Sequence, residues 1–415
     1  MHSVTPNFFP TPCLTQNNDL QPSRSNAWAA LVLLSSVLLA SCGGGSGSSS
    51  SASAEPWIAE VTGPGALVSA EPLASFPVQY FRDGLASQNA GVANAKPQYD
   101  VKAWRIRYLT LDAAGQTVEA SGLLGIPVKA LNATSPVLSY QHGTIFKDAQ
   151  APSNNLAATE PTLLMASMGY LAVAPDYVGY GASKGKEHPY LQATPTAHAV
   201  VDLLTASRIW RQKQGYLGNG QLFLLGYSEG GHATVAAHRQ LQSDNSIHSA
   251  QLVQSLAGAG PYHVGETLNT LLLRVRDQNP LLGGLLSPGL LKNLGTTVRN
   301  EVRRQLVKAL IPADADVIIN TNFIDDFLAD DTAALDRDFN VHDWAPKQSL
   351  LLYHGKDDQT VPYSASTRTL QTMQSRGATT VTLTPCPATP AGHLECVPSF
   401  FDFALSQLKV SARDL

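Results

Sequence analysis

A serine in a glycine-rich turn is the first candidate for chemistry. The apolar run 222–225 is followed by G-Y-S-E-G-G at residues 226–231, and apolar residues then recur at helical spacing to residue 242. A buried strand that turns sharply into a helix strains the residue at the turn, and flanking glycines let strand and helix approach closely. The pattern predicts that Ser228 stands exposed at the carboxyl end of a strand, where its hydroxyl can act as a nucleophile.

A serine hydroxyl needs a base to remove its proton, so the pattern requires a histidine. For a serine on a strand-turn-helix, the expected chain order is serine, acid, histidine. His393 is the only histidine after residue 354, and it lies in a loop after an expected strand at 379–383. We therefore expect His393 to be the general base.

The acid is expected directly after the apolar run 349–353. Two aspartates, Asp357 and Asp358, follow that run, and periodicity does not decide which carboxylate of a loop faces inward. The acid would hold His393 in the right tautomer and stabilise its charged form.

Two segments resemble signatures of the α/β hydrolases. H-G-K-D-D-Q-T-V-P at residues 354–362 resembles the H-G-x-x-D-x-x-V-P pattern, which places the acid at Asp358. Q-H-G-T at residues 141–144 resembles the oxyanion loop of the family, so that Thr144 would donate its backbone N–H with help from its hydroxyl. His142 and Gly143 are expected to shape this turn.

The second oxyanion donor is expected to be the backbone N–H of Glu229, at the start of a helix. The Glu229 side chain has two interpretations. It could be a second acid, or it could simply favour the helix dipole as a carboxylate in the first turn, and we prefer the latter.

Together with A-P-D-Y-V-G-Y-G at residues 174–181, these segments resemble α/β-hydrolase serine esterases, and most closely the secretory lipase and esterase family. The resemblance spans about residues 100–410 and implies hydrolysis of small-molecule or lipid esters, without cofactor or metal. A serine peptidase or amidase is the alternative, because the same three residues cleave amides. A non-catalytic binding protein on this scaffold would lack one of the three, and none is missing.

Strand-like and helix-like segments alternate through most of the chain. Expected strands are 104–111 and 117–126, paired around a turn at 114–115, and 136–142, 170–174, 221–225 and 350–354; expected helices are 162–168, 196–213, 231–242 and 364–376. This alternation predicts an α/β-hydrolase fold, a mostly parallel sheet covered on both faces. The core would comprise residues 57–259 and 346–415.

Residues 260–345 interrupt the alternation, and a structureless loop of that length is improbable. We expect a helical cap. Its leucine-rich stretches, at 271–273, 280–286 and 290–291, are either a lid over an acyl pocket or the cap's own core. Its aspartates lack a calcium-loop pattern and are expected to cap helices or face solvent; they are residues 314, 316, 325, 326, 330, 331, 336 and 338.

Cys386 and Cys396 flank His393. In an exported chain they are expected to form a disulfide that restrains the loop of the base, the alternative being two free thiols.

The first residues are typical of an export signal. A short apolar run at 27–40 ends in Leu39-Ala40-Ser41-Cys42, which resembles the bacterial lipoprotein box. We expect a signal peptide at 1–41, lipid on Cys42, a flexible tether at 42–56 and, by resemblance, outer-membrane localisation. Ordinary secretion is the alternative.

Composition excludes other classes. The chain has 415 residues, 44% hydrophobic and 14% charged, with a net charge of -4. A disordered chain is excluded, and nothing in the charge balance indicates a nucleic acid or an anionic membrane surface as a partner.

Overall fold

The computed structural model describes residues 55–87, 92–278 and 291–415. The chain divides into two units, 1–50 and 51–415, and every described residue belongs to the second. The predicted signal peptide, Cys42, tether residues 42–54 and the leucine-rich stretch 280–286 lie outside the described residues. Among those that are described, no helix is long and apolar enough to span a bilayer.

Nine strands of the described chain form one sheet, in the order β1-β2-β3-β5-β4-β7-β8-β10-β11. The strands are β1 (Leu67–Phe76), β2 (Val101–Leu111), β3 (Thr117–Pro127), β4 (Ser135–Gln141), β5 (Leu171–Pro175), β7 (Gly218–Tyr227), β8 (Leu252–Gly258), β10 (Ser349–His354) and β11 (Val381–Pro385). Strands β1, β2, β3 and β5 pair antiparallel in that order, and every pair from β5 to β11 is parallel. The carboxyl ends of the parallel strands therefore lie at one edge.

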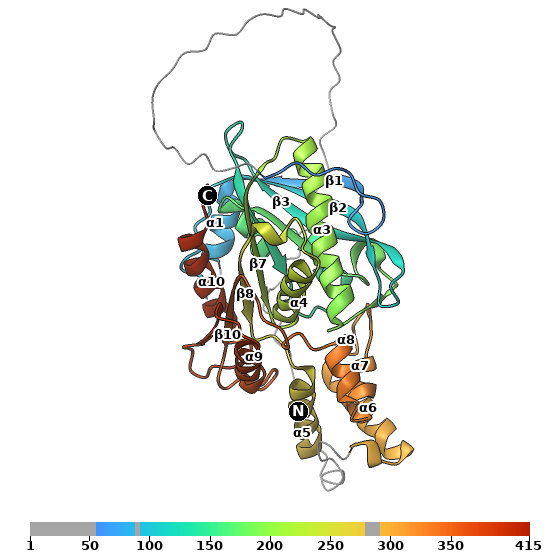
Figure 1. Cartoon of the computed structure of the whole chain (residues 1–415). Helices are drawn as coiled ribbons and strands as arrows, with labels where there is room; N and C mark the ends of the chain where they lie inside the picture. Colours follow the sequence, from blue (N-terminus) through green and yellow to red (C-terminus); the bar gives the residue numbers. More distant parts are fainter. Residues whose placement is uncertain (1–54, 88–91, 279–290) are drawn as a thin grey trace, which may run out of the picture. The chain divides into compact units, whose positions relative to one another are not determined.

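Helices cover both faces of this sheet (Figure 1). One face is packed by α3 (Ala193–Lys213), α4 (Glu229–Ser243) and α9 (Tyr363–Ser375), and the other by α1 (Val78–Ala86), α2 (Pro161–Ser167) and α10 (Val397–Ser411). Buried apolar side chains fill both layers, as parallel strands require. The predicted α/β class is confirmed.

Helix α3 is buried on more than one side. Val200, Leu203 and Leu204 pack on the sheet. Arg208 and Arg211, whose charged side chains ordinarily face solvent, are at most 1% exposed. The reason is a segment from the N-terminal side that covers this end of α3.

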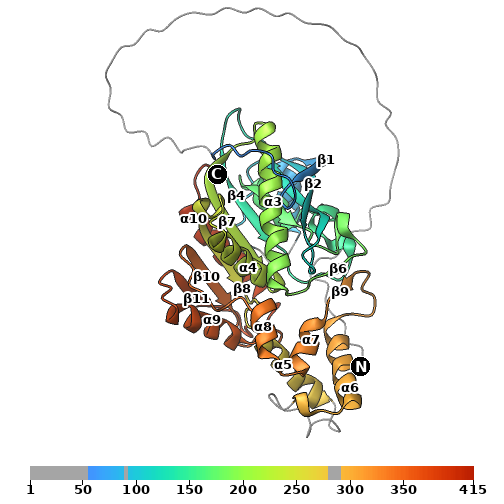
Figure 2. The same ribbon diagram turned by 45° about the vertical axis from the view of Figure 1, so that its right-hand side comes forward.

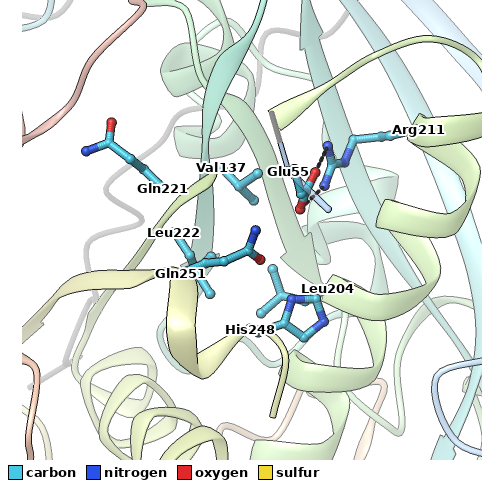
Figure 3. A pocket seen from close by; sticks show the side chains of 8 residues that line it. All are labelled: Glu55, Val137, Leu204, Arg211, Gln221, Leu222, His248 and Gln251. Atoms are coloured by element: carbon cyan, nitrogen blue, oxygen red, sulfur yellow. Dashed lines mark hydrogen bonds and ion pairs between the residues drawn. The ribbon is translucent and has the colours of Figure 1, made fainter. Parts of the chain in front are cut away.

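That segment begins with Glu55, whose backbone N–H bonds to the carbonyl of Gly218 at 2.9 Å. Its carboxylate lies 3.2 Å from Arg208 Nε and 3.2 Å from an Arg211 nitrogen. Figure 3 shows the carboxylate facing Arg211. Burial alone would raise the pKa of Glu55, but the two guanidinium groups hold that pKa below its usual value. The chain therefore joins the folded body at Glu55, two residues inside the predicted tether.

The predicted cap region contains α5 (Val264–Gln278), α6 (Thr296–Leu310), α7 (Asn322–Leu328) and α8 (Thr332–Asp338). These helices surround an apolar cluster of their own, to which Leu272 and Leu291 belong. Leu272 and Leu291 therefore belong to the cap's own core, whereas Leu273 is exposed.

The cap also pairs with the α/β core through β6 (Glu187–His188) and β9 (Ile318–Ile319), which lie side by side in Figure 2. Its aspartates bind protein groups: Asp314 pairs with Lys147, Asp325 with Arg303, and Asp331 caps α8. Within the described ranges, no three histidine, cysteine or acidic residues gather as a metal site would require.

Candidate active site

Ser228 lies between β7 and α4 in a strained conformation, with φ 60° and ψ -125°. Left-handed backbone is costly for a residue with a side chain. A side chain at Gly226 would collide with the carbonyl of Gly230, and one at Gly230 with the carbonyl of Gln141. The glycines therefore permit the sharp strand-turn-helix that presents the Ser228 hydroxyl.

His393 reaches this hydroxyl from the loop between β11 and α10. Its Nε2 lies 2.9 Å from Ser228 Oγ, and its Nδ1 lies 2.6 Å from Asp358 Oδ2. The Tyr227 hydroxyl donates to the His393 carbonyl at 2.7 Å and holds the loop against β7. The structure thus brings the three predicted side chains into one hydrogen-bonded series.

Asp358 lies after β10 and is 4% exposed. Its Oδ1 accepts the backbone N–H groups of Thr360 and Val361 at 2.8 and 2.9 Å. Its Oδ2 lies 3.1 Å from His354 Nε2, in addition to His393. Burial alone would raise the pKa of Asp358, but the hydrogen bonds from the two histidines hold it well below its usual value. The carboxylate is charged wherever His393 can act as a base.

The neighbouring Asp357 does not contact His393. Its carboxylate accepts the backbone N–H of Ala391 at 2.9 Å, and its own N–H donates to the Ala391 carbonyl at 3.1 Å. Of the two candidate acids, Asp358 is the one that the structure places on the histidine, whereas Asp357 ties down the loop.

Sequence reasoning gave His354 no role. Its Nδ1 lies 2.6 Å from Ser366 Oγ, and its Nε2 lies 2.9 Å from the Val361 carbonyl as well as near Asp358. Since a carbonyl only accepts, Nε2 carries a proton and donates. His354 therefore fixes the second side of the acid; the signal was its position four residues before Asp358.

The two predicted oxyanion donors belong to two segments that adjoin Ser228, the start of α4 and the loop after β4. Glu229 is the first residue of α4, where a backbone N–H has no acceptor within the helix. The loop after β4 passes the nucleophile, because a Cβ built on Gly143 would lie 3.7 Å from Ser228 Cβ. Thr144 follows in that loop, with its hydroxyl 3.1 Å from that of Tyr190. His142 bonds to the Gly143 carbonyl at 2.8 Å and shapes the turn.

The Glu229 side chain has a partner that the sequence did not indicate. It is 2% exposed, and its Oε1 lies 2.8 Å from Nε2 of His188, which is 41 residues away. The Glu229 carboxylate therefore binds His188 in addition to any interaction with the helix dipole.

An apolar pocket lies between the loop after β4 and the cap. Its wall includes Tyr190, which contacts Thr144. The pocket is lined by Phe146, Tyr190, Leu310, Ile311, Ile319, Thr321 and Phe323. Its accessible volume is about 10 Å³, room for about one water molecule.

The predicted disulfide joins Cys386 to Cys396. Cys386 follows β11, and Cys396 precedes the first turn of α10. The bridge closes the loop that carries His393.

The family model of the serine aminopeptidases, S33, matches residues 159–385, more than half of the chain. Ser228 and Asp358 lie in the matched part. No curated protein matches the chain significantly.

Two solved structures of low sequence identity are similar. A candidate hydrolase from Legionella pneumophila is 24% identical, with a TM-score of 0.66 over 83% of this chain and 97% of that chain. The rice cell wall degrading esterase LipA from Xanthomonas oryzae is 24% identical, with a TM-score of 0.62 over 84% of this chain and 100% of that chain. At these identities the likeness establishes the fold.

Proposed function

The chain belongs to the serine aminopeptidase S33 family of α/β hydrolases, and we propose that its own reaction is the hydrolysis of carboxylic esters through an acyl-enzyme on Ser228. The observation that carries this proposal is the series Asp358–His393–Ser228 on a strand-turn-helix. Thr144, in the loop that passes Ser228, contacts Tyr190, which lines the small apolar pocket under the cap.

The chemistry follows from the geometry. His393 Nε2 takes the Ser228 proton as Oγ attacks the ester carbonyl, and Asp358 stabilises the imidazolium that forms. The N–H groups of Glu229 and Thr144 bind the oxyanion. His393 then gives its proton to the leaving alcohol, and water repeats the sequence on the acyl-enzyme to release the acid and restore Ser228.

A serine peptidase or amidase is the second candidate, and the description of the matching family favours it. An aminopeptidase needs an anion that binds the free amino group of its substrate. The acid beside the nucleophile, Glu229, is buried and paired with His188, so its carboxylate does not serve that purpose. We therefore propose esters, and not peptides, as the preferred substrates of the protein.

A substrate panel tests the choice. Purified protein is assayed on p-nitrophenyl esters of increasing acyl length and on aminoacyl p-nitroanilides. We expect kcat/KM to be higher for the esters, and its dependence on acyl length then measures how long an acyl chain the site accepts. A higher kcat/KM on the anilides would replace the esterase proposal with the peptidase one.

A further inference from the structure

A buried carboxylate one residue after the nucleophile is an electrostatic liability. Negative charge develops on the substrate oxygen in the transition state, and the Glu229 side chain starts from the same turn that binds it. An uncompensated charge a few ångströms away in a site of low polarity would slow the reaction on the order of 100-fold. This site should therefore contain a compensating charge.

His188 supplies that charge. Its Nδ1 lies 2.9 Å from the Val178 carbonyl, which only accepts, so Nδ1 is protonated. Its Nε2 lies 2.8 Å from Glu229, whose ionised carboxylate also only accepts. Burial alone would raise the pKa of Glu229, but the charge and hydrogen bond of His188 hold that pKa below its usual value. The 2.8 Å contact requires one proton between His188 Nε2 and Glu229 Oε1, so the pair as a whole has no net charge.

The pair also reaches the loop after β4. The His188 ring contacts that of Tyr190, with centroids 6.0 Å apart, and the Tyr190 hydroxyl lies 3.1 Å from that of Thr144. Glu229, His188, Tyr190 and Thr144 thus form one series of contacts between the first turn of α4 and the loop after β4, the two segments expected to supply the oxyanion donors.

The position of His188 is fixed on all sides. Its ring contacts those of Tyr177, Tyr180 and Tyr190, with centroids 5.8, 5.0 and 6.0 Å away. Its carbonyl accepts the backbone N–H of Asn320 at 2.9 Å, beside the pairing of β6 with β9. The cap thereby helps to hold the ion pair in place.

We propose that Glu229 and His188 are positioning residues of the oxyanion site: the pair, through Tyr190, fixes Thr144 relative to the start of α4, and the proton between His188 and Glu229 cancels the carboxylate charge in the first turn of that helix. This inference rests on the proposed acyl transfer at Ser228. Both residues act through other groups, and neither exchanges protons with the substrate.

The test compares two charge states in matched variants, assayed on one p-nitrophenyl ester. His188→Gln leaves Glu229 uncompensated, and we expect kcat to fall about 100-fold with KM within about threefold of wild type. The double variant His188→Gln with Glu229→Gln removes both charges, and its kcat should recover to within about 10-fold of wild type. A merely structural pair would show no such rescue.

A second pair of variants tests the inference if His188→Gln does not fold. Thr144→Val removes the hydroxyl and should lower kcat about 10-fold, whereas Thr144→Ser keeps it and should stay within about threefold of wild type. Equal rates for the two variants would overturn the inference.

The inference and the proposed function fail in different ways. A wild-type protein without esterase activity overturns both. If the wild type is active, the inference alone is overturned when His188→Gln retains full kcat, or when the double variant is no faster than His188→Gln.

Discussion

Two adjacent aspartates after β10 have different partners. Asp358 contacts His393, and Asp357 binds the backbone of Ala391. Both lie in the same loop with the same charge, so no pattern of apolar residues separates them. The resemblance to the H-G-x-x-D motif pointed to Asp358, and its contact with His393 agrees.

This difference predicts unequal effects of the same substitution. Asp358→Asn should lower kcat on the order of 10³-fold or more, because an amide neither selects the His393 tautomer nor stabilises the imidazolium. Asp357→Asn keeps an oxygen that accepts the Ala391 N–H, and its kcat should stay within about 10-fold of wild type. Steady-state kinetics of the two variants checks this. Equal losses would contradict the assignment of the acid.

The contact between His188 and Glu229 was missed because it joins residues far apart in sequence. The types and order of Ser228, Asp358 and His393 follow from local motifs, since each motif reports the element that carries it. His188 has no such motif. Its role depends on a contact across 41 positions, which only the fold creates.

At the scale of elements, the loop between β11 and α10 is restrained at several points. The bridge Cys386–Cys396 closes it, Tyr227 binds the His393 carbonyl, and Asp357 binds Ala391. The loop therefore keeps part of its geometry without the bridge.

Cys386→Ala or reduction should consequently lower kcat only several-fold, through a slightly misplaced His393. A loop this short contributes about 2 to 3 kcal/mol to the free energy of unfolding, and the melting temperature should fall by a few degrees. Kinetics and thermal melts with and without dithiothreitol measure both. Free thiols in the active, exported protein would contradict the prediction.

The segment that begins at Glu55 attaches to the end of α3 through charge. Glu55→Gln leaves Arg208 and Arg211 buried without a counter-ion, and the free energy of unfolding should fall by about 3 kcal/mol. Urea unfolding followed by circular dichroism measures the loss.

Glu60→Gln is the matched control. Glu60 pairs with Lys213 at the exposed surface of the same segment, where an ion pair contributes little. We expect its unfolding midpoint to match that of wild type. Similar losses for both variants would mean that the segment is held by packing and not by the buried charges.

Sheet membership was partly predictable. Strand β5, L-A-V-A-P, stood out because it is apolar along its length and buried on both faces. Strand β8, L-V-Q-S-L-A-G, carries two polar residues, and β1 contains Glu71 and Pro72, so neither gave a strand signal. The order of the strands depends on long-range pairing, which local patterns do not contain.

At the scale of the whole molecule, the α/β core and the cap contribute different parts of the candidate site. The core carries the hydrogen-bonded series, and the cap closes one side of the apolar pocket. The length of the interruption after residue 259 predicted a helical insertion. Its contacts with β6 could not be predicted, because two-residue strands have no pattern.

Membrane attachment through Cys42 is a further proposal at this scale. It comes from the lipoprotein-like sequence around that residue. Cys42→Ser should move the protein out of the membrane fraction of the expressing bacterium while its kcat is unchanged. Fractionation followed by esterase assay measures both, and a Ser variant that stays with the membranes would contradict the lipid anchor.

Covalent labelling of Ser228 tests the central claim most directly. Purified protein is treated with a fluorophosphonate, followed by intact mass and peptide mapping, while ester hydrolysis is recorded in parallel. We predict one adduct per chain, on Ser228, with activity lost in proportion to labelling, and a folded Ser228→Ala variant that neither labels nor hydrolyses the ester. Hydrolysis retained by Ser228→Ala, or an adduct on Ser228 that leaves turnover intact, would contradict the account.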